Sequence, residues 1–221
     1  MKKKIGRCLG LIIILLFFLF LGGCAGSKTF LLHFSYDASG TSPFLQGAPR
    51  PVTAAVYQFL DVRPERLYLG RRIYRDGMVD YYKPDGGTVE QVVTESIVKI
   101  MEKAGFKVTR VNRTLNPDKE GFQDFPSDLV LGGKIEALWI EAKTGYVTTD
   151  AKARISLKYS WGLVKDQTWE IKTIEGSAEK TDQPLFKPED AEKLINEVLK
   201  DGLDKLLKDE SLLREKLLKP R

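Results

Sequence analysis

A cysteine at the end of an apolar run is the residue with the clearest potential for chemistry. Cys24 follows Gly22 and Gly23, and an almost purely apolar run occupies residues 9–21. Four cations lie before this run: Lys2, Lys3, Lys4 and Arg7. The run is too short to favour a membrane span, which takes about 20 apolar residues. Positive, apolar and small residues in this order are typical of a secretory signal that is cleaved after the small residues.

The sequence Leu21-Gly22-Gly23-Cys24 resembles the lipobox of bacterial lipoproteins. The resemblance implies that residues 1–23 are removed as a signal peptide, and that the Cys24 sulfur and the new amine receive fatty acyl chains such as palmitate. Two or more chains give a stable anchor, whereas one holds only marginally. Ala25 stands where Asp favours retention in the inner membrane. The resemblance therefore favours the periplasmic face of the outer membrane, with the inner membrane as the alternative. The alternative is an ordinary signal peptide or anchor helix that happens to contain a cysteine.

Length, charge and cysteine content limit the classes of protein. Removing 23 residues from 221 leaves 198, which suggests one domain or at most two. The removed segment has four positive and no acidic residues, so the formal net charge falls from +5 to +1 and gives no argument for nucleic-acid binding. Cys8 leaves with the signal, so disulfides and cysteine-based sites are excluded. We predict a lipidated tether over 24–51 and a single periplasmic domain over 52–221.

The sequence offers little for catalysis. It lacks the glycine-rich phosphate-binding motifs, the His-Glu-x-x-His motif and the Gly-x-Ser-x-Gly motif. His33 is the only histidine, so histidine triads and zinc sites lack their ligands. Two carboxylates among Asp61, Asp76, Asp80 and Asp85 could cleave a glycan, although turn and surface acids explain them more simply. We predict a protein without enzymatic activity, cofactor or metal.

Arginine and tyrosine are interspersed in the least regular stretch of the chain, residues 66–82. Both are enriched at binding hot spots, and arginine pairs with phosphate and carboxylate groups. We predict a partner-binding site made of Arg66, Arg71, Arg72, Tyr74, Arg75, Tyr81 and Tyr82. The partner would be another envelope protein or a lipid. The alternative is a solvated loop whose tyrosines cover the edge of a sheet. The tryptophans are more simply explained by core packing: Trp139, Trp161 and Trp169.

The elements that must hold this stretch follow from hydrophobic periodicity. Apolar runs and alternation of period two predict strands over 52–60, 106–111, 129–142, 150–164 and 169–180. The last two form an antiparallel hairpin. The turn signal Asp76-Gly77 predicts a second hairpin between residues 69–75 and 78–82. Residues 26–51 are rich in Ser, Gly, Thr and Pro, and would hold at most one short edge strand.

Helical periodicity predicts helices over 89–104, 188–207 and 211–218. Thr88 and Gln91 form a capping box at the start of the first. Pro188 suits the first turn of the second. Gly202 lies on the apolar stripe of that helix, where it costs about 1 kcal/mol relative to Ala. A close approach to the sheet would explain its presence.

Two amphipathic helices and a sheet with one apolar face bury their apolar surfaces by stacking as two layers. We predict an α+β two-layer sandwich, with a mostly antiparallel sheet and both helices packed on one face. The other face would carry Lys152, Arg154 and Lys158 toward water or a partner.

This order of elements resembles the YajG-like family of uncharacterised bacterial lipoproteins and, more loosely, the auxiliary lipoproteins of ABC-type envelope transporters. The resemblance rests on the lipobox, on Phe59-Leu60-Asp61-Val62-Arg63, on Ala104-Gly105-Phe106 and on the hairpin before the last long helix. The family has no agreed activity, so the resemblance implies placement and fold. We predict a non-catalytic, membrane-anchored envelope lipoprotein that binds a protein or lipid. The alternatives are an auxiliary subunit of an ABC-type lipid transport system and a weak carboxylate-based cell-wall glycan hydrolase.

Overall fold

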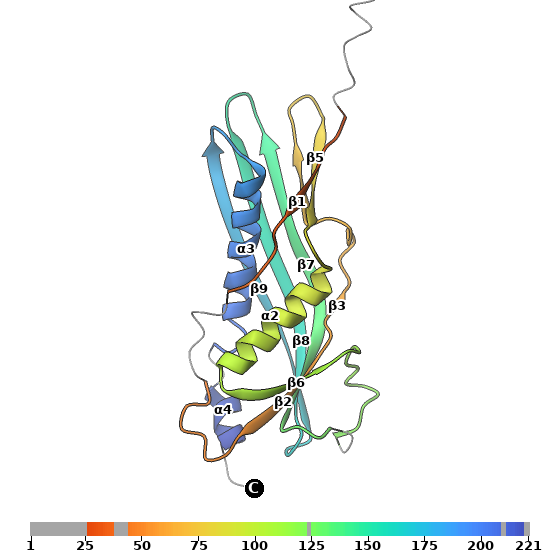
Figure 1. Cartoon of the computed structure of the whole chain (residues 1–221), viewed down its shortest axis with the longest axis vertical. Coiled ribbons are helices and arrows are strands. Elements are labelled where there is room, and N and C mark those ends of the chain that lie inside the picture. Colours follow the sequence, from red (N-terminus) through yellow and green to blue (C-terminus); the bar gives the residue numbers. More distant parts are fainter. Residues whose placement is uncertain (1–25, 38–43, 123–124, 209–210, 219–221) are drawn as a thin grey trace, which may run out of the picture.

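The computed structural model describes residues 26–37, 44–122, 125–208 and 211–218 (Figure 1). The predicted signal peptide, residues 1–23, and the predicted lipidation site, Cys24, lie outside the described residues. Within the part of the chain that is described, no helix is both long enough and apolar enough to cross a bilayer.

One sheet of nine strands forms the centre of the described fold. The strands are β1 (Thr29–Leu32), β2 (Val52–Tyr57), β3 (Leu60–Asp61), β4 (Gly70–Ile73), β5 (Val79–Pro84), β6 (Phe106–Val111), β7 (Leu129–Thr144), β8 (Thr149–Leu163) and β9 (Thr168–Gln183). The helices are α2 (Val89–Lys103), α3 (Pro188–Asp204) and α4 (Ser211–Leu218). The strand predicted over 52–60 is divided into β2 and β3, and the other predicted elements are present with slightly shifted ends.

Strand β7 is the spine of this sheet. One of its edges pairs antiparallel with β8 along its whole length, and β8 pairs antiparallel with β9. Its other edge pairs in turn with β2, β3 and β4, all parallel to it. Strand β6 extends the sheet beyond β2, and β5 and β1 extend it beyond β4. The α+β class and the mostly antiparallel sheet are confirmed through the three long strands. The parallel pairing of β2, β3 and β4 with β7 is an addition that local periodicity could not show.

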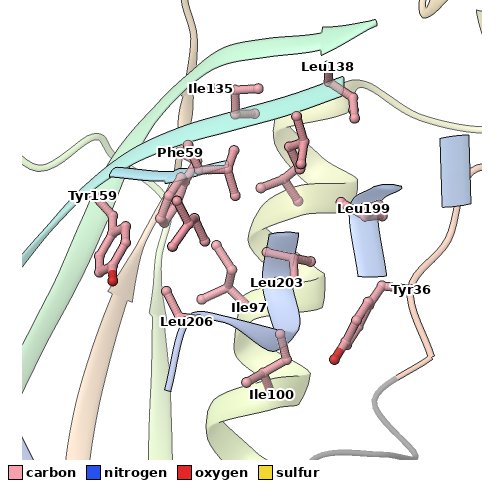
Figure 2. Close-up of a cluster of buried hydrophobic side chains, with 14 of the residues drawn as sticks. Tyr36, Phe59, Ile97, Ile100, Ile135, Leu138, Tyr159, Leu199, Leu203 and Leu206 are labelled. Atoms are coloured by element: carbon pink, nitrogen blue, oxygen red, sulfur yellow. The ribbon is translucent and has the colours of Figure 1, made fainter. Parts of the chain in front are cut away.

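Helices α2 and α3 cover one face of the sheet (Figure 1). Figure 2 shows Ile97 of α2, and Leu199 and Leu203 of α3, in one cluster with Phe59 and with Leu138 of β7. Burying an aliphatic side chain of this size stabilises a fold by about 1.5–3 kcal/mol. The predicted packing of two amphipathic helices on one face is therefore confirmed, and this cluster holds the two layers together.

Two local predictions about the helices are confirmed. The Thr88 hydroxyl accepts the backbone N–H of Gln91 at 3.3 Å, and the Gln91 side chain accepts the backbone N–H of Thr88 at 3.1 Å. At Gly202 of α3, a Cβ atom would lie 2.6 Å from Cγ2 of Ile155 in β8. The absence of a side chain therefore allows the helix to approach the sheet closely.

The short edge strand expected within the predicted tether, residues 24–51, is present as β1, and residues 26–37 pack along the sheet and α3. Strand β1 pairs in parallel with β5, and Leu32 and Tyr36 are buried. The Tyr36 hydroxyl donates to the Asp204 carboxylate of α3 at 2.6 Å. Leu32, Phe34 and Tyr36 alternate with exposed residues and point inward, a short period-two pattern that is hard to recognise among the surrounding polar residues.

The second face of the sheet is partly covered by the connection between β6 and β7. The ring of Phe122 from that connection lies 4.9 Å from the ring of Trp169 in β9, centroid to centroid. Farther along the strands, this face is exposed to solvent, and we call it the open face. Three cations point outward from β8 there, as predicted: Lys152, Arg154 and Lys158.

Candidate functional site

The residues predicted to form a binding site between 66 and 82 occupy different environments. Tyr82 of β5 belongs to the core, with 1% of its surface exposed. Burial raises the pKa of its hydroxyl. A side chain in this position cannot contact a partner, so the structure removes Tyr82 from the predicted site.

Arg72 and Tyr74 connect strands to one another. Arg72 Nε donates to Thr144 Oγ1 at 2.7 Å, and its Nη1 donates to the Phe186 carbonyl at 2.7 Å. The Tyr74 hydroxyl donates to Asp80 Oδ2 at 2.7 Å. Burial and this hydrogen bond raise the pKa of the Tyr74 hydroxyl. The two side chains thereby tie β4 to β7, to β5 and to the connection before α3, which is a structural role that the sequence analysis did not foresee.

The remaining predicted residues lie at the surface but not in one place. Arg71 of β4 and Tyr81 of β5 are register partners on the open face. Arg75 lies in the turn after β4, where its guanidinium is 3.2 Å from the ring centroid of Tyr146. Arg66 is exposed in the connection between β3 and β4. The structure therefore brings Arg71 and Tyr81 together and places Arg66 and Arg75 in separate loops.

A buried ion pair holds the loop that carries Arg66. The side chains of Asp61 and Arg63 are each 3% exposed. They meet through two hydrogen bonds, of 2.9 and 2.8 Å. The other guanidinium N–H groups donate to the carbonyls of Arg66, Tyr68 and Leu138, at 3.2, 3.0 and 2.8 Å. All five donors of Arg63 are used, which is what a buried guanidinium requires. From the sequence, Asp61 was considered only as a candidate glycan-cleaving carboxylate, and its pairing with Arg63 was not predicted.

Three of the four carboxylates considered for glycan cleavage accept hydrogen bonds within the fold. Asp76 accepts the backbone N–H of Met78 at 3.0 Å, and Asp85, the fourth, is exposed. Asp61 is engaged by Arg63. Asp80 accepts hydrogen bonds from the Tyr74 hydroxyl at 2.7 Å and from the backbone N–H of Lys28 at 2.8 Å. Such bonds are typical of acids that hold turns and strands. Among the described residues, no group of three or more His, Cys, Asp and Glu side chains is placed to hold a metal ion.

A hollow of about 590 Å³ lies on the open face beside Trp139. Its aromatic and polar lining residues come from the three long strands, and we call them the open-face site: Trp139, Glu141, Lys152, Arg154, Ser177 and Glu179. Pairing between β7, β8 and β9 aligns them in two rows. Trp139, Arg154 and Ser177 form one row, and Glu141, Lys152 and Glu179 form the next. Arg71 extends the second row onto β4.

Charges of both signs alternate across this site. Arg71 pairs with Glu141 at 2.9 Å, and Lys152 pairs with Glu179 at 3.0 Å. The hydrogen bond from Arg71 lowers the pKa of the Glu141 carboxyl. Exposed pairs of this kind contribute about 0–1 kcal/mol each. Charged groups of a partner can therefore replace them with little loss. Within the described residues, Arg154 forms no ion pair and is available to such a partner.

The arrangement is suited to recognition. Trp139 presents a partly exposed indole, and Arg154 stands directly opposite it across the strands. Tryptophan and arginine are enriched at binding hot spots. Their positions on paired strands reduce the ordering that binding would require. Trp139 was expected in the core. The signal that could have identified it is an alternation of outward Trp139, Glu141 and Lys143 with buried Leu138, Ile140 and Ala142.

Solved structures with distant similarity to this chain include a bacterial lipoprotein. A putative neuraminyllactose-binding hemagglutinin homolog from Helicobacter pylori is 12% identical, with a TM-score of 0.46 over 85% of this chain and 98% of that one. Lipoprotein GNA1162 from Neisseria meningitidis is 12% identical, with a TM-score of 0.36 over 60% of this chain and 87% of that one. An uncharacterized protein is 9% identical, with a TM-score of 0.40 over 86% and 99%. No protein-family model and no curated protein matches the sequence.

Similarity at this level carries no functional conclusion. Membership of the YajG-like family stays a prediction.

Proposed function

We propose that this chain is a non-catalytic envelope lipoprotein that is anchored through Cys24 and binds a protein partner with the open-face site. The sequence Leu21-Gly22-Gly23-Cys24, after a positive and an apolar segment, supports the anchor. Ala25 supports the periplasmic face of the outer membrane, by the resemblance to lipoproteins sorted there.

The observation that carries the binding proposal is the hollow beside Trp139 and Arg154. An exposed sheet face places an aromatic ring, a guanidinium and alternating charges within two neighbouring rows. Charges of both signs on these rows favour a protein partner, because complementary side chains of a protein can match them and fix the orientation of the complex. A surface without these aligned rows would offer a partner neither an anchor residue nor a preferred orientation.

Photo-crosslinking in cells tests the binding site. A photoreactive phenylalanine analogue replaces Ser177 in the open-face site, and in a matched control it replaces Asp166, which is exposed in the turn between β8 and β9. We expect a protein adduct from position 177 and none from position 166. Mass spectrometry of the adduct identifies the partner, and a subunit of an ABC-type transporter would favour the auxiliary-lipoprotein alternative.

A second variant tests the named residues. Trp139→Ala together with Arg154→Ser should reduce the yield of the adduct strongly, because truncating one hot-spot residue costs about 2 kcal/mol or more. That corresponds to a loss of about 30-fold in affinity. Equal adducts from both positions, or a yield that the double variant leaves unchanged, would show that partners bind elsewhere. Mass spectrometry of the exported protein tests the anchor: the proposal requires loss of residues 1–23 and acylation of Cys24.

A further inference from the structure

Exposed apolar side chains gather at one end of the molecule. Tyr146 and Val147, in the turn between β7 and β8, are 80% and 78% exposed. Leu185, in the connection from β9 to α3, is 69% exposed, and Met78, in the turn between β4 and β5, is 36% exposed. These four belong to the nine large exposed apolar side chains of the described residues. We call the three connections together the tip: residues 74–78, 145–148 and 184–187.

Strand register brings the three connections of the tip together. Ile73, at the end of β4, is paired with Lys143 of β7. Thr149, at the start of β8, is paired with Thr144 of β7 on one side and with Gln183, at the end of β9, on the other. The three connections therefore follow directly from one row of the sheet, and Figure 1 shows them at one end of it. The Arg75 guanidinium over the Tyr146 ring joins two of them, at 3.2 Å from the ring centroid.

The described chain also begins at this end. The Lys28 carbonyl accepts the backbone N–H of Tyr81 at 2.8 Å, and Thr29 is the register partner of Tyr81. Tyr81 lies three residues after Met78 of the tip. Thr29 is the fifth residue after Cys24, and an extended chain spans at most about 3.6 Å per residue. An acylated Cys24 would therefore hold Thr29 within about 18 Å of the membrane surface.

From these observations we infer that the tip docks onto the lipid bilayer that holds Cys24, with the side chains of Tyr146, Val147 and Leu185 in the headgroup region. This inference rests on the proposed lipid anchor. Tyrosine suits that depth because its ring is apolar and its hydroxyl is polar, and arginine can extend its charged end toward water. Charges of both signs lie near the tip: Lys28, Arg75, Lys143 and Lys187 with Asp76, Asp150 and Asp182. Apolar contact rather than net charge would therefore carry the docking.

The lipidated chain permits a specific label. The full sequence has two cysteines: Cys8, which is predicted to leave with the signal, and Cys24, which is predicted to be acylated. The variant Val147→Cys therefore carries one free thiol, and Asp166→Cys provides a matched control at an exposed turn of the opposite end of the sheet. Leu185→Cys places a second probe in another connection of the tip. Each purified lipidated variant is labelled with an environment-sensitive fluorophore and reconstituted into vesicles of phosphatidylethanolamine and phosphatidylglycerol.

We expect the probes at positions 147 and 185 to emit at shorter wavelength in vesicles than in detergent-free buffer, and to be quenched by nitroxide-labelled lipid. The probe at position 166 should show neither change. Water-exposed emission from both tip probes in an acylated protein would overturn the docking and leave the anchor intact. A shift to shorter wavelength without lipid quenching would mean that protein covers the tip, and would also overturn it. A mass spectrum without acylation would overturn both the anchor and the docking.

Discussion

Removing the positive partner of the buried Asp61–Arg63 pair should destabilise the protein strongly. The variant Arg63→Met keeps an unbranched side chain but deletes five N–H donors. Asp61 would then carry a charge in a site where its side chain is 3% exposed. The carbonyls of Tyr68 and Leu138 would lose donors that now lie at 3.0 and 2.8 Å. Breaking a buried pair in this way costs about 3–5 kcal/mol.

A loss of that size is a large fraction of the stability of an ordinary domain, which is about 5–15 kcal/mol. Urea unfolding followed by tryptophan fluorescence measures it, since the chain has three tryptophans. With a slope of about 1–3 kcal/mol per molar urea, the midpoint should fall by about 1 M or more. The matched control is Arg71→Met, because the Arg71–Glu141 pair is partly exposed, with 43% and 29% of the side-chain surfaces accessible. That variant should lose less than about 1 kcal/mol.

The double variant Asp61→Leu with Arg63→Met tests whether the lost stability comes from the unpaired charge of Asp61. Replacing both charges by apolar groups removes the uncompensated carboxylate, so part of the lost stability should return. The reasoning fails if Arg63→Met loses no more stability than Arg71→Met. It also fails if the double variant is less stable than Arg63→Met alone, because the uncompensated charge would then not be the main term.

Two further predictions concern stability. Gly202→Ala should destabilise the protein, because the new Cβ atom would lie 2.6 Å from Cγ2 of Ile155. Overpacking of this kind costs about 1–3 kcal/mol, whereas the gain in helix propensity is about 1 kcal/mol. A higher urea midpoint would contradict this. At Asp128, burial opposes ionisation, but hydrogen bonds from Arg50 and Thr53 outweigh it and hold the pKa of the carboxyl well below its usual range. The stability from this lowered pKa is present above the unfolded pKa of about 3.9 and is lost as the pH falls below it. Asp128→Asn should therefore lower the urea midpoint at neutral pH and flatten its fall below about pH 4; a parallel pH dependence in both proteins would refute this.

Elements with strong local signals were predictable from the sequence. Strand β8 has one buried apolar face and one solvent-exposed polar face, and apolar and polar residues alternate along its sequence accordingly. The capping box at Thr88 and Gln91 is a local pattern that needs no tertiary contact to be recognised. The close approach at Gly202 followed from a glycine in a position where the helix would otherwise favour a larger residue.

Features that depend on contacts distant in sequence were not predictable in the same way. The parallel pairing of β2, β3 and β4 with one edge of β7 is a matter of strand order, which periodicity does not encode. Arg63 resembles any surface arginine until the carbonyl of Leu138 is placed beside it, 75 residues later in the chain. The arginines and tyrosines of 66–82 were recognised as a set, but alternation along β4 and β5 sends neighbours to opposite faces.

The long strands also fix the distance between the tip and the hollow beside Trp139. If the tip lies on the bilayer, the long strands rise from it, and the hollow beside Trp139 stands at a fixed height above the membrane surface. Adding two residues to each strand between the tip and that hollow would preserve every inward and outward side chain and raise the hollow by about 7 Å. One added residue would instead reverse the faces. On the proposed docking, the sheet would act as a spacer whose length changes in steps of two residues while the binding surface stays the same.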